Sequence, residues 1–302
     1  MSVLHAAAPG SRVTLAATLW PAAGSAAEAS MIEGWAAGSG RSLGRGDLVL
    51  LTRHRPGGLL IGMLNRRPVS AIATVGHDTG LCFTSAPIVD PAFRGRAIEE
   101  ATAELALRHL ADSPVALEAP PEMRDFFAAR GFYTSWRTIA FGGPVPAPRP
   151  SQAQVVSLDA ELLGQAVALD MRCFPADRSA LTTDWACEKD RYAVGFVQSN
   201  RLLGYGVIRP AFGAARIGPL YATTIRVAAA LFDALAEHAG QHGARAVAID
   251  VPEPNTTALA LCESRGLSFD TETLRMNRPS ARMPQQGVDL TVLYGLTSRE
   301  LG

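Results

Sequence analysis

The sequence predicts a mixed α/β protein built from two similar halves, each with a mixed sheet covered by helices. Three observations support this fold class. Strand-like and helix-like segments alternate along the 302 residues. A proline- and glycine-rich run from Phe141 to Pro150 interrupts them, and the same short unit closes both halves. The chain is long for one compact domain and suits two domains of about 150 residues each.

The first half begins with an alternating strand at 13–19 and an alanine-rich helix at 22–35. The segments that follow in this half are strands at 47–52, 66–75 and 80–89 with a turn at His77-Asp78, a helix at 97–111, a buried strand at 114–118, a helix at 123–130 and strands from 131 to 141. The helix period of 3.6 and the strand period of 2 separate these segments.

The second half has the same order of elements. Its predicted segments are a helix at 159–173, a hairpin at 192–209 that turns at Ser199-Asn200, a strand at 215–221, a helix at 227–242, a strand at 244–251, a helix at 255–265 and strands from 267 to the end. Proline lacks a backbone donor and glycine costs entropy, so Phe141 to Pro150 is predicted to be an interdomain linker. We therefore expect an N-terminal domain at 1–143, a linker at 144–152 and a C-terminal domain at 153–302.

A repeated unit indicates that the halves are related. Val115-Ala-Leu-Glu118-Ala-Pro leads to Arg130-Gly-Phe132, and Val247-Ala-Ile-Asp250-Val-Pro leads to Arg265-Gly-Leu267. Each copy is an apolar strand that ends in a carboxylate and a proline, followed by a short helix and a glycine. Internal duplication explains this pattern, although strand, turn, helix and glycine also recur in any mixed α/β protein.

Composition excludes several classes of partner. The formal net charge is zero and 19% of residues are charged, so the chain lacks the basic field that nucleic acids or anionic membranes require. No apolar run reaches the roughly 18 residues of a membrane span. The stretch from Val13 to Ala27 is similar to a signal peptide, but Trp20-Pro21 interrupts it. We expect a cytoplasmic protein, a monomer or a homodimer.

Neither a metal site nor a disulfide framework is expected. The four cysteines lack close paired spacing, and the pair His238 and His242 has no accompanying carboxylate.

The run Pro91-Ala-Phe-Arg94-Gly95-Arg96-Ala97-Ile98 lies between a predicted strand and a predicted helix. Free N–H groups and the positive helix end attract phosphate at such a position. The run resembles the pyrophosphate loop of the GCN5-related N-acetyltransferase (GNAT) family, in which Arg or Gln is followed by two residues, Gly, one residue, and Gly or Ala. Further segments resemble a set of bacterial tandem acetyltransferases, and these are Glu33-Gly-Trp35, Ile217 to Ala222, Asp250 to Asn255, Arg275-Met276 and Gly295 to Gly302.

This resemblance implies two tandem GNAT-fold domains. Each would have a sheet splayed between its fourth and fifth strands, with acyl-CoA lying in the wedge. A backbone amide of the fourth strand would bind the thioester carbonyl, and the amine of a small molecule would attack it directly. The implied co-substrate is acetyl-CoA or another acyl-CoA, without a metal.

The resemblance also implies residues that bind the coenzyme. In the first half they are Ile88, Val89, Arg94, Gly95, Arg96, Ala97 and Ile98, and in the second half Leu220, Tyr221, Thr223, Thr224 and Asn255. The sequence departs from the family pattern at both loops. Ala97 and Glu99 stand where the family has its loop glycines, and the second loop contains no glycine. Alternatively, Arg94 and Arg96 are solvated loop residues, and Thr223 and Thr224 cap a helix.

The catalytic candidates are Glu118, Asp250 and Cys262. Glu118 and Asp250 end equivalent strands that would face the cleft, where a carboxylate could deprotonate the ammonium group of the acceptor. Each could instead cap the proline turn that follows it. The family's acid is a tyrosine, and its positions hold Phe127 and Cys262. Phenylalanine cannot donate a proton, whereas cysteine could donate one or simply pack in the core.

These observations predict an acyl-CoA-dependent N-acyltransferase that acts on the amine of a small molecule. Proximity and oxyanion stabilisation survive the loss of the acid. Two alternatives stay open. One is a non-catalytic or regulatory protein with degenerate acetyl-CoA sites, and the other is an enzyme that accepts another thioester or ester donor, such as a carrier-protein thioester or aminoacyl-tRNA.

Overall fold

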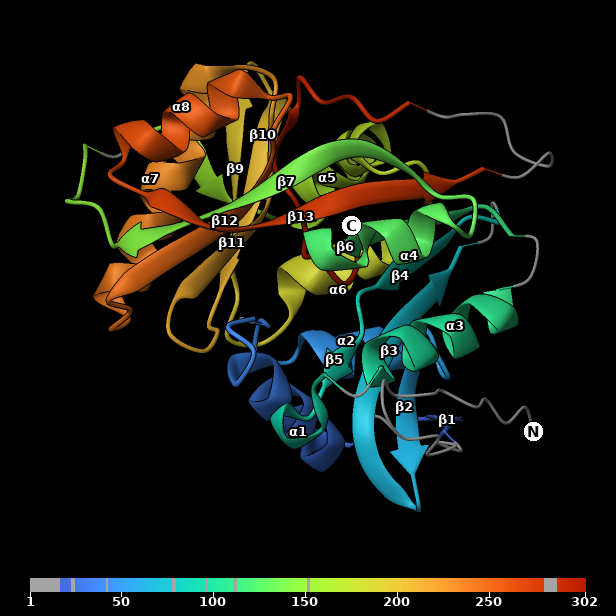
Figure 1. Cartoon of the computed structure of the whole chain (residues 1–302). Helices are drawn as coiled ribbons and strands as arrows, with labels where there is room; N and C mark the ends of the chain where they lie inside the picture. Colours follow the sequence, from blue (N-terminus) through green and yellow to red (C-terminus); the bar gives the residue numbers. More distant parts are fainter. Residues whose placement is uncertain are drawn as a thin grey trace.

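The computed structural model describes residues 17–22, 25–41, 43–77, 80–95, 97–110, 113–150, 153–279 and 287–302. The predicted strand residues 13–16, Asp78 of the predicted turn and the site residue Arg96 therefore lie outside the described residues. Figure 1 shows strands of both halves joined in one twisted sheet, with helices on its faces. This arrangement confirms the predicted mixed α/β class.

The elements alternate as expected for this class. In the first half they are β1 (Ala17–Pro21), α1 (Ala26–Ala37), α2 (Asp47–His54), β2 (Leu59–Leu64), β3 (Arg67–Gly76), β4 (Cys82–Ser85), β5 (Ile88–Val89), η1 (Pro91–Phe93), α3 (Ile98–Leu110), β6 (Val115–Ala119), η2 (Pro121–Met123), α4 (Arg124–Ala128) and β7 (Tyr133–Pro144). In the second half they are β8 (Val155–Ser157), α5 (Ala160–Cys173), α6 (Ser179–Cys187), β9 (Tyr192–Gln198), β10 (Arg201–Arg209), β11 (Ala215–Ala222), α7 (Ile225–Gln241), β12 (Ala246–Pro252), α8 (Thr256–Ser264), β13 (Ser268–Arg278) and β14 (Leu293–Gly295).

The two halves exchange strands. The sheet follows the order β1-β2-β3-β4-β6-β13-β7-β12-β11-β10-β9-β8. Strand β13 of the second half thus lies between β6 and β7 of the first half, and β7 pairs with β12 of the second half. Figure 1 shows β7 in green and β13 in red side by side across the centre of the molecule. Each half therefore completes the sheet of the other.

The run from Phe141 to Pro150 was predicted to be an interdomain linker without a central strand, and this prediction was wrong for the first residues of the run. Strand β7 continues to Pro144, and Gly142 and Gly143 lie between β12 and the first residues of β13. A Cβ atom at Gly143 would stand 3.1 Å from the carbonyl oxygen of Gly266 and from the side chain of Leu267. The glycine therefore permits a close approach of two chains at this point. The predicted boundaries at 143 and 153 stay a prediction.

The predicted strand at 47–52 was wrong, because these residues form helix α2. Gly46 precedes it in the left-handed conformation, with φ of 78°. Asp47, Leu48, Leu50 and Leu51 are buried. A short apolar run carries no clear period, so strand and helix cannot be separated until the packing partner is known.

Two further strands of the first half differ from the prediction. The segment 80–89 is not one strand, because it is interrupted at Ala86-Pro87 and continues as β5. Strand β2 was not predicted, although it forms a hairpin with β3. The turn of that hairpin uses Asn65 and Arg66, both at positive φ, a geometry that glycine more often signals in a sequence.

The core extends across the strand exchange. One buried cluster joins α1 and α2 of the first half to α5, α6 and the C-terminal residues, and another packs α7 and α8 against the second half of the sheet. Among the residues that the structure describes, none of the helices has the length and apolar composition needed to span a membrane.

Candidate functional site

The first-half wedge forms where β4 and β5 leave β6. Strand β4 runs parallel to β6 up to the pair Ser85 and Glu118, and the chain then departs at Ala86-Pro87. Strand β5 pairs with β3, and no other strand in the described part of the chain pairs with its second edge. The guanidinium of Arg41 donates to the carbonyl oxygens of Ala86 and Pro87 at 3.3 and 2.9 Å. A side chain from the loop after α1 thus satisfies the backbone acceptors at the interruption.

The loop after β5 contains two residues in the left-handed conformation. Gly95 and Ala97 both adopt positive φ, 69° and 57°, before α3 begins at Ile98. Alanine disfavours this left-handed region, so Ala97 stores backbone strain of the kind that clusters at ligand sites. Arg94 is exposed, while Ile98 is buried and fixes the first turn of α3. The unpaired N–H groups of that turn make it a candidate phosphate site.

The second-half wedge is occupied by the protein's own C-terminal segment, residues 287–302. Strands β11 and β12 pair in parallel only from Ala215 to Ile217 and then diverge. Strand β14 enters the gap and pairs with β11. The N–H of Ala222 donates to the carbonyl oxygen of Val292, and the N–H of Leu296 donates to the backbone carbonyl oxygen of Asp250 on β12, both at 2.9 Å. Backbone hydrogen bonds across this wedge are therefore made within the chain.

The predicted coenzyme residues of the second half contact this segment or the adjacent helix. Asn255 donates its side-chain amide to the carbonyl oxygens of Leu290 and Leu293, both at 3.0 Å. Thr224 caps α7 by accepting from Val227, and Thr223 is exposed. The remaining two residues, Leu220 and Tyr221, are buried and belong to the edge of β11 that β14 covers.

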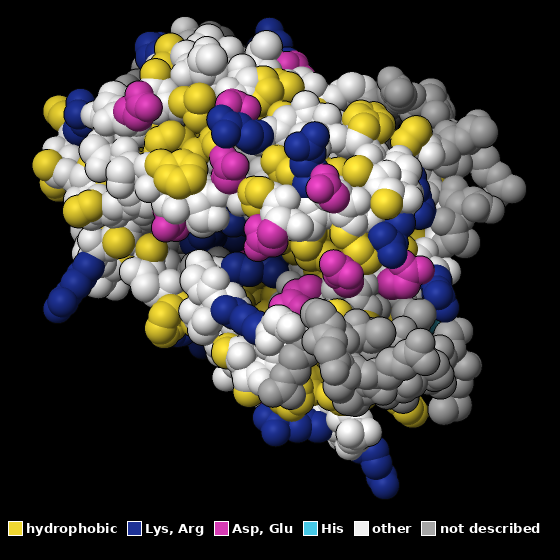
Figure 2. All heavy atoms as spheres, in the orientation of Figure 1, with side chains coloured by type: hydrophobic (Ala, Val, Ile, Leu, Met, Phe, Trp, Pro, Cys, Tyr) yellow, Lys and Arg dark blue, Asp and Glu magenta, His cyan; other side chains and the backbone are white. Residues whose placement is uncertain are grey.

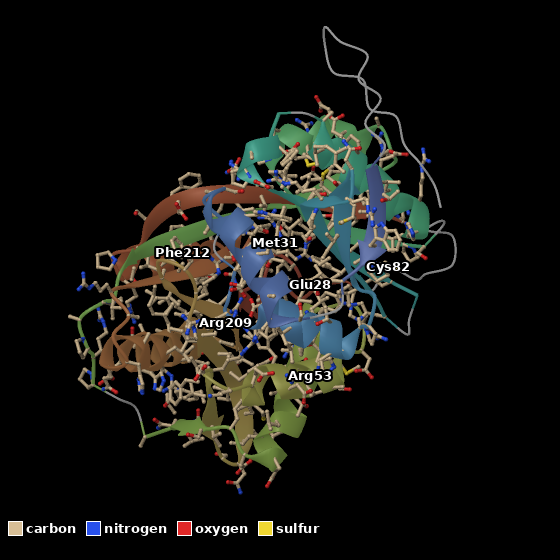
Figure 3. The ribbon with its side chains drawn as sticks, turned by 90° about the horizontal axis from the view of Figure 1, so that it is seen from below. Glu28, Met31, Arg53, Cys82, Arg209 and Phe212 are labelled. Carbon is tan, nitrogen blue, oxygen red and sulfur yellow. The ribbon has the colours of Figure 1, made fainter. Side chains whose placement is uncertain are left out.

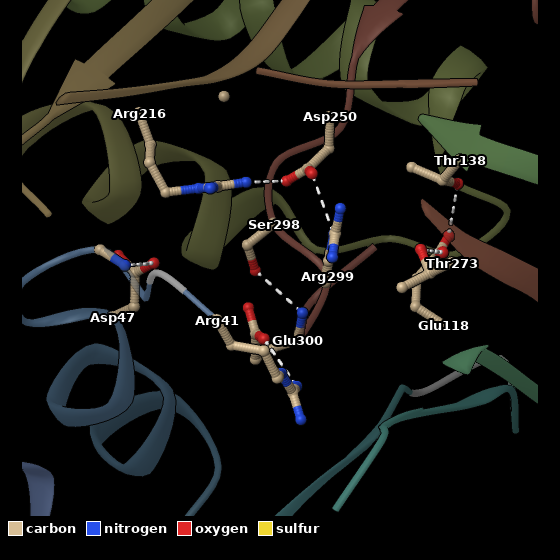
Figure 4. Close-up of polar contacts among 12 residues, drawn as sticks. Arg41, Asp47, Glu118, Thr138, Arg216, Asp250, Thr273, Ser298, Arg299 and Glu300 are labelled. Carbon is tan, nitrogen blue, oxygen red and sulfur yellow. Dashed lines mark hydrogen bonds and ion pairs between the residues drawn. The ribbon is translucent and has the colours of Figure 1, made fainter. Parts of the chain in front are cut away.

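An arginine and carboxylate cluster joins the two wedges (Figure 4). Asp250, at the end of β12, accepts from Arg216 of β11 and from Arg299 of the C-terminal segment. Burial alone would raise the pKa of Asp250, but the charges of the two arginines outweigh burial and lower that pKa to about 2. The carboxylate is thus ionised at neutral pH and tied to two cations, an arrangement that stabilises the fold.

The ion pairs of Asp250 predict a pH dependence of stability. A depressed folded-state pKa contributes stability above the unfolded value of 3.8, and that contribution is lost as pH falls toward about 2. The shift corresponds to about 2 kcal/mol. In urea unfolding between pH 6 and pH 2.5, we expect the difference in unfolding free energy between wild type and Asp250→Asn to shrink as pH falls. A constant difference would contradict the assignment, and Glu161→Gln, at an exposed position of α5, is the control.

The same cluster extends into the first half. Glu300 of the C-terminal segment pairs with Arg41 at 3.3 Å. Burial lowers the pKa of Arg41, and the charges of Arg299 and Arg94 act in the same direction. Arg94 therefore lies close enough to Arg41 to sense its charge. The face of the molecule drawn in Figure 2 has a hollow between its upper and lower parts. Lys or Arg side chains lie inside the hollow, and acidic side chains lie around it.

Glu118 lies at the centre of the exchanged strands. Its oxygens accept from Thr138 of β7 at 3.1 Å and from Thr273 and Arg275 of β13 at 2.6 and 2.8 Å. The side chain is 1% exposed. This set of donors joins β6, β7 and β13 around one carboxylate (Figure 4).

The two residues at the family's acid position are both in the core. Phe127 packs against Phe126 and Phe132. Cys262 is 1% exposed within the α7 and α8 cluster, and burial together with Glu263 raises the pKa of its thiol to about 12. Such an environment favours packing over proton transfer.

Several residues of the cluster were not identified from the sequence. Arg41, Arg216 and Arg299 lie on separate elements, and no spacing rule connects them. The only available signal was the resemblance of Gly295 to Gly302 to tandem acetyltransferases, which marked the segment that carries Arg299 and Glu300 but gave neither residue a role.

Comparison with known proteins accords with this geometry. Residues 166–291 match the family model described as an acetyltransferase (GNAT) domain. The chain is 24% identical over 275 residues to holothin acyltransferase from Pseudoalteromonas sp. (strain SANK 73390), covering 91% of this chain and 92% of that protein.

Two solved structures share the fold over most of the chain. A putative acetyltransferase from Pyrococcus horikoshii superimposes with a TM-score of 0.72 at 21% identity, covering 95% of this chain and 96% of that one. A tandem GNAT protein from the clavulanic acid biosynthesis pathway gives a TM-score of 0.60 at 16% identity, covering 89% and 99%. At these identities the structural likeness establishes the fold, and it confirms the predicted tandem arrangement. Together, the match of residues 166–291 to a GNAT domain and the fold shared over most of the chain show that this is a tandem GNAT-fold protein.

Proposed function

We propose that the protein transfers an acyl group from acyl-CoA to the amine of a small molecule, and that the first half holds the acyl-CoA. The observation that carries the assignment is the contrast between the wedges. In the second half, β14 pairs with the edge of β11, whereas in the first half no strand of the described residues pairs with the second edge of β5. The relative named holothin acyltransferase supports an acyl group as the transferred unit.

The first-half loop supplies suitable contacts for a diphosphate. Gly95 and Ala97, both at positive φ, precede the first turn of α3, whose N–H groups lack intrahelical acceptors. Arg94 adds an exposed positive charge beside them. Glu99 stands in the same first turn and opposes an anion, which reduces the affinity without removing the cradle. The edge of Ile88 and Val89 would pair with the amides of the pantetheine arm.

Transfer in this wedge would depend on positioning more than on acid catalysis. The amine nitrogen forms a bond to the thioester carbonyl carbon, and the carbon–sulfur bond then breaks to release the thiolate of CoA. A backbone N–H near Ala86 to Val89 would stabilise the oxyanion. Phe127 supplies no proton, so the thiolate would take one from solvent or from the protonated nitrogen of the tetrahedral intermediate. Glu118 remains the proposed base of this half.

The test is a calorimetric titration of the full chain with acetyl-CoA and with CoA. A charge-assisted contact to phosphate contributes about 1.5–3 kcal/mol, so Arg94→Ala should weaken binding at least about tenfold. Arg108→Ala, near the far end of α3, is the matched control and should bind as wild type does. Equal affinity of Arg94→Ala and wild type would exclude this loop. Absence of binding to either compound would overturn the proposed donor.

A non-catalytic function is favoured by two residues. Phe127 stands at the family's acid position, and Ala97 stands where the loop normally has glycine. Thiol release measured with acetyl-CoA and a panel of small amines separates the possibilities. Binding of acetyl-CoA without release of CoA with any amine would support the non-catalytic alternative.

A further inference from the structure

A cavity of about 770 Å³ lies away from both wedges. It is bounded by the start of β11, the end of α7 and the loop before α2. The wedges open at the opposite end of β11, near Leu220 and Tyr221. Ligand pockets typically enclose about 300–1,000 Å³, so the cavity has the size of a small-molecule site.

Its lining is strongly basic. The ionisable residues around it are Arg45, Arg191, Arg209, Arg245, His238, His242 and Asp190. A single carboxylate therefore faces four arginines. Arg45 and Arg245 are exposed, and their guanidinium groups are free to move toward a ligand. The walls between them consist of Ile208 and of Ala, Gly and Pro residues, whose small size leaves room for a bound molecule.

The floor of the cavity has a surplus of buried positive charge. Asp47 accepts from Arg191 at 2.9 Å and from Arg209 at 3.0 Å, and all three side chains are at most 2% exposed. One carboxylate thus serves two guanidinium groups. Figure 3 places Arg209 close to the blue helices of the first half, where the halves meet. A buried, uncompensated charge is costly, and an additional anion would reduce that cost.

Arg191 shows the effect of this imbalance. Its Nε and Nη1 atoms have no hydrogen-bond partner among the described residues, and its guanidinium stacks over Trp185 at 3.8 Å. Burial lowers the pKa of Arg191 to about 10, because Asp47 offsets only part of the desolvation and Arg209 adds to it. The existing contacts of this arginine therefore do not satisfy its charge.

Aromatic rings form one wall. Tyr192 stacks on His238 with ring centroids 3.8 Å apart, and His238 stacks on His242 at 4.0 Å. Burial and the neighbouring His242 lower the pKa of His238, so at neutral pH its ring is a neutral donor and acceptor. The stack fixes both imidazole rings at the cavity. Their NMR chemical shifts should therefore change when a ligand binds there.

We propose that this cavity binds an anionic small molecule through a phosphate or carboxylate group, at a site separate from the acyl-CoA wedge. Arg45 and Arg245 would contact the anion at the rim, and the charge of Arg191 and Arg209 would attract it toward the floor. Guanidinium groups bind both the tetrahedral oxygens of a phosphate and the planar oxygens of a carboxylate, so one probe of each kind is required.

The experiment titrates the full chain with pyrophosphate and, separately, with citrate. The measurements are calorimetric affinity and the imidazole NMR shifts of His238, His242 and the distant His54. We expect at least one probe to bind and to move His238 and His242 but not His54. The double variant Arg45→Ala/Arg245→Ala should weaken that binding at least about tenfold by removing charge-assisted contacts. Arg201→Ala, at the exposed first residue of β10, should bind as wild type does.

A second comparison separates this site from the coenzyme loop. Arg94→Ala should retain the binding that the double variant loses, whatever the outcome of the acetyl-CoA titration. Pyrophosphate binding that is lost only in Arg94→Ala would assign the anion to the wedge and overturn the cavity site. The proposal also fails if neither probe binds, or if the double variant binds both probes with unchanged affinity. Preference for citrate over pyrophosphate would identify a carboxylate ligand.

Discussion

Replacement of Asp47 by alanine is expected to lower the free energy of unfolding by about 3–5 kcal/mol. The substitution leaves Arg191 and Arg209 buried without the carboxylate they share. It also removes the acceptor of the Gly44 N–H, which lies 3.2 Å from the Asp47 carboxylate. Because these contacts join α2 to β10 and to the residue before β9, their loss loosens the junction of the two halves. Urea unfolding followed by circular dichroism measures the change.

A second variant tests the cause of that loss. If an unpaired buried charge is responsible, the double variant Asp47→Ala/Arg191→Met should be more stable than Asp47→Ala alone, because it removes one of the two cations. Asp184→Ala, which disrupts an exposed pair with His54, should change stability by no more than about 1 kcal/mol. A loss below 1 kcal/mol for Asp47→Ala, or no recovery in the double variant, would contradict the charge argument.

Substitution of Arg178 by methionine should be similarly destabilising, by about 3–5 kcal/mol. Its guanidinium makes a bidentate pair with Asp170 at 2.8 and 2.9 Å. It also donates to the carbonyl oxygens of Leu301 and Gly302 at 2.8 and 3.2 Å and to Thr297 at 2.8 Å. Methionine fills similar volume but leaves these buried acceptors unsatisfied. The same side chain thus joins α5 to the end of the chain.

Hydrogen exchange shows whether the C-terminal segment is released. Amides of residues 292–302 should exchange faster in Arg178→Met than in wild type. The increase in exchange rate should also be larger for the amides of β12 than for those of β2. The matched control is Arg172→Ala on α5, whose exposed pair with Asp289 also contacts the C-terminal segment and should contribute less than about 1 kcal/mol. Unchanged protection of residues 292–302 in Arg178→Met would show that β14 is held without this arginine.

Elements with a long, clear period were predictable from the sequence. The helices at 97–111, 159–173 and 227–242 correspond to α3, α5 and α7, because their apolar residues recur at the helix period and pack on the sheet. Elements of four to nine residues were less accessible. Residues 47–52 and helix α6 became helices because buried partners from the other half cover them, and that information is absent from a local window.

The site was accessible in part for a similar reason. The loop from Arg94 to Ile98 is contiguous, so its turn and helix start could be recognised in one segment. The contacts of Glu118 and Asp250 depend on β13 and on the C-terminal segment, which approach only after the strands exchange. Occupation of the second wedge by β14 was also unpredictable, because residues 293–295 have no distinctive composition and act through backbone pairing.

The crossed positions of β7 and β13 make the two halves mutually dependent during biosynthesis. Until β13 has left the ribosome, β6 and β7 each present an edge without the strand that lies between them. The nascent first half therefore stays an open sheet, prone to adventitious pairing, while most of the second half is synthesised. A gene divided between them would give two fragments, each lacking the strand that the other carries.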